Sequence, residues 1–308
     1  MKLRSVPVLF ALLSLCLIYG CTRPEDQSPT NEPAIEAAPI SVCVSIPPQA
    51  FFVERIGGER VSVVVLVGPG QSPATYEPTP SQIAQLDSAD VYFRIGVPFE
   101  DALLSRVRSS MPGKNIVDLR EGIQLRQISE HGGHGHSRGR EDPHTWLDPR
   151  LAAEQARTIQ RELARLDPEG QPQYNAALEV LLEELEAVRR QAAEMLAPVR
   201  GRAMVVFHPA FGYFADAYGL EQVAIELEGR EPAPRELERV IDDAKWLEAR
   251  AIFVQPEFAT ASAEAVAKEI GAEIVRIDPL ARDYLDNHLR MAREVAEALE
   301  AAEDERED

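Results

Sequence analysis

Long hydrophobic runs and cysteines are scarce in this sequence. The apolar run at residues 6–18 is shorter than the roughly 20 residues that a membrane-spanning helix needs. Because Lys2 and Arg4 precede it, the segment predicts an export signal rather than a spanning helix.

The chain has only three cysteines, and Cys16 lies within this signal. If Cys21 is also consumed by acylation, Cys43 is the only free thiol and no intrachain disulfide can form. Cys43 lies in an alternating apolar strand, which predicts a small buried residue.

Residues 18–21 place an aliphatic and then a small residue before Cys21, as in the cleavage site of bacterial lipoproteins. Cys21 is therefore predicted to be the lipidated first residue of the mature chain, held at the extracytoplasmic face of a bacterial membrane. An ordinary secretory signal is the alternative, because Tyr19 is not the usual small residue. Residues 22–39 are rich in Pro, Glu, Ser, Thr and Asn, and predict a flexible tether.

Positive charge is also in deficit, with 32 Lys and Arg against 51 Asp and Glu and a net charge of -19. This balance argues against nucleic-acid partners, whose phosphates would be repelled. The sequence contains no internal repeat, no His-Glu-x-x-His helix and no nucleophile motif.

Apolar patterning predicts an α/β fold of two lobes with central parallel sheets, joined by one long rigid helix. Strands are expected at residues 40–46, 61–67, 91–95 and 115–119, and again at 203–207, 222–225, 251–254 and 273–277. Helical periodicity dominates residues 149–198, with a break near Asp167-Pro168, and the last helix is expected to begin near Asp283. The expected units are a signal at 1–20, a tether at 21–39, an N-terminal lobe at 40–167, a linking helix at 168–199 and a C-terminal lobe at 200–308.

Histidines mark the expected cleft between the lobes, where parallel strands end. His208 and Asp278 each follow a strand directly, and His144 lies in the Asp-Pro-His-Thr-Trp-Leu-Asp-Pro segment at 142–149. Imidazole is the common ligand of zinc and related metals. Taken singly, a histidine or Asp-Pro at a strand end is also typical of a turn. His288, among polar residues of the last helix, predicts a solvated side chain. Three more histidines, His131, His134 and His136, form a Gly/His tract that predicts an exposed loop.

Seven ordered segments of the chain carry a common pattern: Ser-Ile-Pro-Pro-Gln (45–49), Tyr-Glu-Pro-Thr-Pro-Ser-Gln (76–82), the 142–149 segment, His-Pro-Ala-Phe-Gly-Tyr-Phe (208–214), Glu-Gly-Arg-Glu-Pro (228–232), Ile-Phe-Val-Gln-Pro-Glu-Phe (252–258) and Asp-Pro-Leu (278–280). Read together, these motifs resemble the zinc and manganese ABC-transporter solute-binding protein family. The resemblance implies two α/β lobes, a rigid linking helix and one metal in the cleft, with His144, His208 and Asp278 on family ligand positions.

One family ligand is missing. The family has a histidine just before Tyr-Glu-Pro, and this chain has Ala74, which cannot coordinate a metal. Two imidazoles and one carboxylate remain, and water or a donor from elsewhere fills the fourth position. Nearby donors are Tyr76, Glu77 and the loop histidines, although Glu77 is more typical of a structural hydrogen-bonding group. The nitrogen-rich set favours Zn²⁺ and leaves Mn²⁺, Ni²⁺, Co²⁺ and Cu²⁺ open.

The resemblance implies an extracytoplasmic receptor, not an enzyme, that captures a divalent transition metal and passes it to the permease subunit of an ABC importer. The receptor is expected to be a monomer that meets the membrane through its lipid anchor. The His-rich loop either collects metal for the cleft or is a spacer. The alternatives are an adhesin or binding lipoprotein with a degenerate metal site, and a zinc hydrolase, which would need a general base beside a metal-bound water.

Overall fold

The computed structural model describes residues 38–128, 141–226, 233–258 and 261–307. Within these ranges, no helix combines the length and the apolar character that crossing a membrane requires.

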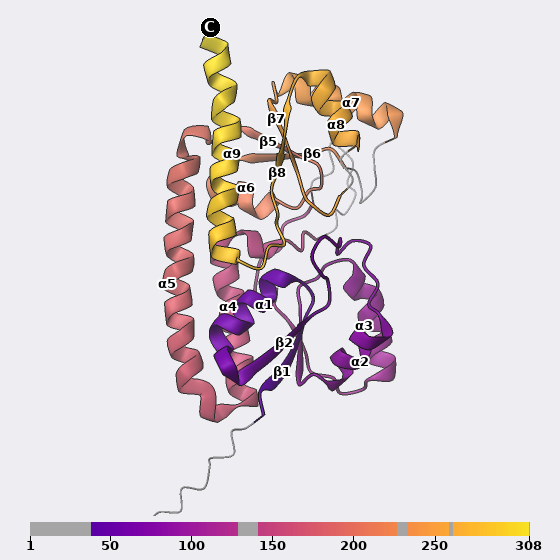
Figure 1. The fold of residues 1–308 in the computed structure, drawn as a ribbon, viewed down its shortest axis with the longest axis vertical. Coiled ribbons are helices and arrows are strands. Elements are labelled where there is room, and N and C mark those ends of the chain that lie inside the picture. Colours follow the sequence, from indigo (N-terminus) through magenta and orange to yellow (C-terminus); the bar gives the residue numbers. More distant parts are fainter. Residues whose placement is uncertain (1–37, 129–140, 227–232, 259–260, 308) are drawn as a thin grey trace, which may run out of the picture. The chain divides into compact units, whose positions relative to one another are not determined.

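The first sheet contains four parallel strands in the order β2-β1-β3-β4. Helix α1 lies on one face of the sheet, and α2 and α3 lie on the other (Figure 1). Thr79 caps α2 by accepting a hydrogen bond from the Gln82 amide, and Pro80 fits the first turn because it needs no donor there. The bounds are β1 Ile40–Val44, α1 Pro47–Gly57, β2 Val61–Val65, α2 Pro80–Ser88, β3 Val91–Arg94, α3 Phe99–Ser110 and β4 Ile116–Asp118.

The second sheet repeats this topology, with parallel strands in the order β6-β5-β7-β8. In both sheets the second strand lies on one side of the first strand, and the third and fourth strands lie on its other side. The crossover connections therefore run in opposite directions on the two sides of the first strand. Parallel sheets of this kind bind ligands at that point, outside the carboxyl ends of the strands. The bounds are β5 Ala203–Val206, α6 Gly212–Tyr218, β6 Glu221–Ala224, α7 Pro234–Trp246, β7 Ala251–Val254, α8 Ala261–Ile270 and β8 Glu273–Arg276.

Within the described residues, three long helices accompany the sheets: α4 (Pro149–Leu166), α5 (Gln171–Leu196) and α9 (Tyr284–Glu307). Helix α5 packs against both α4 and α9 (Figure 1). Asp167 ends α4, and its carboxylate accepts hydrogen bonds from Gly170 N–H and from Arg60, so the chain turns sharply before α5.

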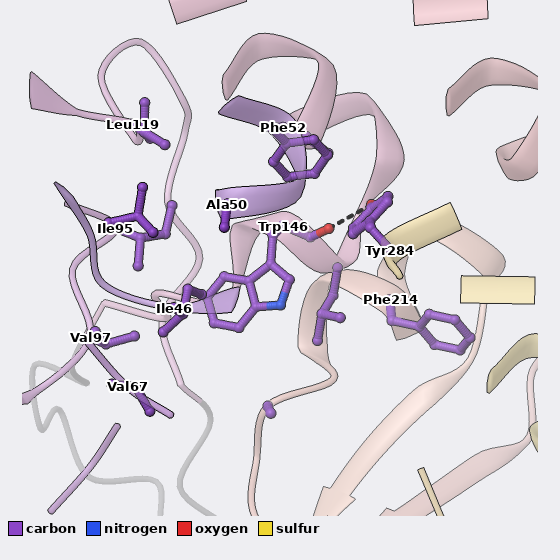
Figure 2. Packing of buried hydrophobic residues seen from close by; sticks show 14 of the residues in the cluster. Ile46, Ala50, Phe52, Val67, Ile95, Val97, Leu119, Trp146, Phe214 and Tyr284 are labelled. Atoms are coloured by element: carbon purple, nitrogen blue, oxygen red, sulfur yellow. Dashed lines mark hydrogen bonds between the residues drawn. The ribbon is translucent and has the colours of Figure 1, made fainter. Parts of the chain in front are cut away.

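Two hydrophobic clusters hold the fold together. The larger one runs from the first sheet through α4, α5 and α9 to one face of the second sheet. The smaller one lies between the other face of the second sheet and helices α7 and α8. Side chains of β5 alternate between them, because successive strand residues point to opposite faces: Met204 and Val206 join the larger cluster and Val205 the smaller. Figure 2 shows part of the larger cluster around Trp146.

The predicted fold class is confirmed: two parallel α/β sheets and a long helix are present. Cys43 is buried and free as expected, and burial raises the pKa of its thiol to about 12. The prediction for His288 is wrong. Its side chain is fully buried among Phe214, Tyr218 and Tyr284, because α9 packs into the core on this face.

Candidate metal centre

A cavity of about 430 Å³ is bordered by loops that follow strands of both sheets. Residues 72–74 and 96–98 follow β2 and β3, and residues 208–210, 257–258 and 279–280 follow β5, β7 and β8. The predicted ligands His144 and His208 both line it. The cavity therefore lies where the topology predicts a binding crevice.

His144 is oriented by Asp142. Its Nδ1 lies 2.7 Å from Asp142 Oδ1, and the same oxygen accepts a hydrogen bond from the His144 backbone N–H at 3.0 Å. Asp142 is only 1% exposed, so water does not compete for this contact. A carboxylate only accepts, which places the ring proton on Nδ1 and leaves a lone pair on Nε2.

His208 repeats the arrangement in the second half of the chain. Its Nδ1 lies 2.7 Å from Oε2 of Glu226, which is 4% exposed. Burial lowers the pKa of His208, with Glu226 opposing the shift and His144 adding to it. The imidazole is thus neutral at neutral pH, and its Nε2 lone pair is available.

The rings of His144 and His208 lie close together in an edge-to-face arrangement. Their centroids are 5.5 Å apart and their planes meet at 78°. Within the described residues, neither Nε2 has a hydrogen-bond partner. A histidine that bonds a carboxylate through one nitrogen and offers the other is the usual arrangement of a metal ligand with its supporting group. The chemistry of this pair therefore fits a divalent transition metal.

The described residues hold no group of three His, Cys, Asp or Glu side chains that is ready to coordinate a metal. Asp278, the third predicted ligand, follows β8, and its Oδ1 accepts a hydrogen bond from the Leu280 N–H at 2.8 Å. Burial raises the pKa of Asp278, and the Asp283 charge adds to this rise. Its residue neighbours Pro279 and Leu280 line the cavity, and the ligand role of Asp278 stays a prediction.

Glu257 is a further carboxylate on the cavity wall. Burial raises its pKa to about 7, and the charge of Asp278 adds to the rise. No hydrogen bond from another side chain holds it within the described residues.

Hydrogen bonds join the His144 segment to the second half of the chain. The Trp146 indole N–H donates to the Pro279 carbonyl at 2.8 Å, and the Tyr284 hydroxyl donates to the Trp146 carbonyl at 2.7 Å (Figure 2). Gly212 allows a third close approach: a Cβ atom there would lie 2.9 Å from Asp142 Oδ2 and even closer to Arg126. These contacts bring His144 beside His208.

The remaining predicted residues fall in different places. Ala74 lines the cavity, and its replacement of a family histidine stays a prediction. Glu77 is exposed and is not among the residues that line the cavity. His131, His134, His136 and the lipidation residue Cys21 lie outside the described residues.

Sequence reasoning missed three carboxylates of the site: the orienting role of Asp142, and Glu226 and Glu257 altogether. A signal for two of them was present. Glu226 and Glu257 come shortly after β6 and β7, just as His208 comes after β5. The same rule about strand ends that selected His208 would have selected them.

The family described as zinc-uptake complex component A, periplasmic (ZnuA), matches residues 42–302. This chain belongs to the ZnuA family. The predicted family resemblance is thereby confirmed.

Individual relatives agree with the ZnuA assignment. The chain is 28% identical over 276 residues to the manganese-binding lipoprotein MntA of Halalkalibacterium halodurans, covering 88% of each chain. A crystal structure of ZnuA superimposes with a TM-score of 0.78 at 40% identity, covering 85% of this chain and 99% of that one. The laminin-binding protein Lmb of Streptococcus agalactiae, described as bifunctional with adhesin and metal-transporting activity, gives a TM-score of 0.74 at 26% identity, covering 84% and 99%.

Proposed function

We propose that this protein is an extracytoplasmic receptor that captures a divalent transition metal, zinc before others, and delivers it to the permease of an ABC importer. The observation that carries the proposal is the paired histidines: His144 and His208 each contact a buried carboxylate through Nδ1, and both line one cavity. Membership of the zinc-uptake family supports the same function.

Zinc is favoured because of the ligand atoms. Neutral imidazole nitrogens suit zinc, copper and nickel, whereas manganese prefers oxygen donors. Asp142 and Glu226 fix the tautomer and the orientation of the rings before any metal arrives, so little ordering is left for the binding step. We include Asp278 as a third ligand, on the strength of its family position and its place beside the cavity-lining Pro279.

The test is metal affinity of the chelator-stripped protein, measured by competition against a chromogenic chelator. His144→Ala, His208→Ala and Asp278→Ala are each expected to weaken Zn²⁺ binding strongly and non-additively, because each removes one of few ligands. Zinc binding by His208→Ala that equals the parent would refute the site. Thermal melting of each variant separates loss of a ligand from loss of the fold.

Membrane delivery follows from the same proposal. The receptor is held by a lipid on Cys21 and meets its permease as a monomer.

Adhesion in addition to transport is the second candidate, favoured by the likeness to Lmb. Binding of the metal-loaded protein to immobilised laminin, with albumin as control, tests it. Zinc-dependent hydrolysis of ester or phosphate substrates is expected to be absent, and turnover that Glu257→Gln abolishes would contradict the receptor function.

A further inference from the structure

Ala74 lines the cavity, and its methyl group offers no donor atom to a metal there. The two imidazoles and the proposed third ligand, Asp278, provide three donors, and a zinc ion that is held by protein side chains alone takes four. The sequence leaves open whether water or another side chain fills this position.

Glu257 lies at the topologically favoured place for such a donor. In the strand order β6-β5-β7-β8, the crossovers diverge between β5 and β7. His208 follows β5 and Glu257 follows β7, so these two side chains flank the crevice in which sheets of this type bind ligands. Asp278 follows β8, at the edge of the sheet and one strand farther away.

The loop that carries Glu257 is fastened directly to His208. The Gln255 amide nitrogen donates to the His208 carbonyl at 3.0 Å. The Phe258 ring stacks on the His208 imidazole, with centroids 4.8 Å apart and planes 26° apart. These contacts fix the backbone on both sides of Glu257 next to a histidine of the site. Within the described residues, the Glu257 carboxyl group accepts only from its own backbone N–H, and no side chain of another residue holds it.

Other carboxylates near the cavity are less available. Glu77 is exposed and does not line the cavity. Asp142 and Glu226 are already bonded to the two imidazoles. Asp278 is already the third ligand of the proposed function, and its Oδ1 accepts a hydrogen bond from the Leu280 N–H. Among these carboxylates, only Glu257 lines the cavity, and within the described residues its carboxyl group has no hydrogen bond from another residue.

We propose that Glu257 turns onto the bound metal and supplies a carboxylate donor in place of the imidazole that Ala74 lacks. This inference rests on the proposed function, because it requires the metal to bind between His144 and His208. Rotation about the side-chain bonds of Glu257 brings the carboxylate to the ion, which agrees with the absence of a preformed three-ligand group in the described part of the chain. Replacing a nitrogen donor by oxygen makes the site harder, so it accepts Mn²⁺ better than an all-imidazole site does.

Four variants of the chelator-stripped full chain test this: Glu257→Gln, Ala74→His, the double variant, and Glu77→Gln as a matched control on the exposed side. Affinities for Zn²⁺ and for Mn²⁺ are measured by chelator competition and calorimetry. Glu257→Gln should weaken Zn²⁺ binding by at least about 10-fold, and Mn²⁺ binding by more, because losing even a supporting group costs about that much. Ala74→His should restore Zn²⁺ binding in the Glu257→Gln background while leaving Mn²⁺ binding weak. Glu77→Gln should bind both metals as the parent does.

Other results overturn the inference. If Glu257→Gln binds both metals like the parent, Glu257 is not a ligand. A water-filled position predicts that Ala74→His tightens Zn²⁺ binding equally with and without Glu257. A histidine from the 131–136 loop predicts that deletion of that loop, and not Glu257→Gln, weakens binding. His208→Ala keeps this test separate from the proposed function, because unchanged zinc binding in that variant refutes the cleft site itself. Loss of binding in His208→Ala together with parental binding in Glu257→Gln refutes only the role of Glu257.

Discussion

Glu226 offers a sharp test of how the protein prepares its imidazoles for metal. The carboxylate is 4% exposed, and its Oε2 lies 2.7 Å from His208 Nδ1. Hydrogen bonds to charged groups contribute about 1.5–3 kcal/mol. If the metal-bound state loses this contribution, Zn²⁺ affinity falls by about 10- to 100-fold. This agrees with the effect of removing supporting groups at other metal sites. Glu226→Ala is expected to approach the upper value, because it leaves the ring free to turn.

For Glu226→Gln, the loss of Zn²⁺ affinity should lie near the lower value, because the amide oxygen still accepts the Nδ1–H but carries no charge. Glu221→Gln is the matched control, since Glu221 is an exposed residue at the start of the same strand β6. Chelator competition gives the affinities, and thermal melting reports whether each variant is folded. A folded Glu226→Ala protein that binds Zn²⁺ as tightly as the parent would refute the idea that this carboxylate prepares His208.

Three further outcomes are expected. Cys21→Ser should leave the protein in the soluble fraction, because acylation is the only anchor that the sequence predicts; a variant that still pellets completely with membranes would contradict the lipoprotein prediction. Gly212→Ala should lower the melting temperature and weaken Zn²⁺ binding, since its Cβ would displace Asp142 Oδ2 from 2.9 Å away; parental values for both would show that the contact relaxes freely. Burial lowers the pKa of His288 to about 3, so the unfolded chain binds a proton below about pH 6.5 that the folded chain does not. Stability should therefore fall as the pH drops from about 6.5 toward 3, by about 1.4 kcal/mol per pH unit from this residue. His288→Gln, which keeps an acceptor for Tyr218, should remove that part of the slope in urea titrations, and an unchanged slope would argue against it.

The sequence was a good guide where local pattern decides structure. Short apolar runs gave strands such as β7 at its observed bounds, because a strand buried on both faces needs continuous apolar side chains. The helix break at Asp167-Pro168 also followed from local chemistry, since the proline ring hinders a continuing helix. The prediction that His288 is solvated was wrong for the opposite reason. Its sequence neighbours are polar, but the face of α9 that it occupies packs against Phe214 and Tyr218, which come from another element.

The sequence by itself determined the two α/β halves, the long helices and the family, because these depend on periodicity and on ordered motifs. It also selected His144 and His208, since histidines after strands or in a family motif are visible in one dimension. Only the tertiary structure decided that their rings lie 5.5 Å apart and that Asp142 and Glu226 hold their Nδ1 atoms. It also brought Glu257 to the wall of the same cavity as Ala74. The physical reason is that His208, Glu226 and Glu257 follow different strands, and parallel crossovers bring distant strand ends together at one edge of the sheet. Asp142 lies only two residues before His144, but the local fold decides that its carboxylate meets Nδ1.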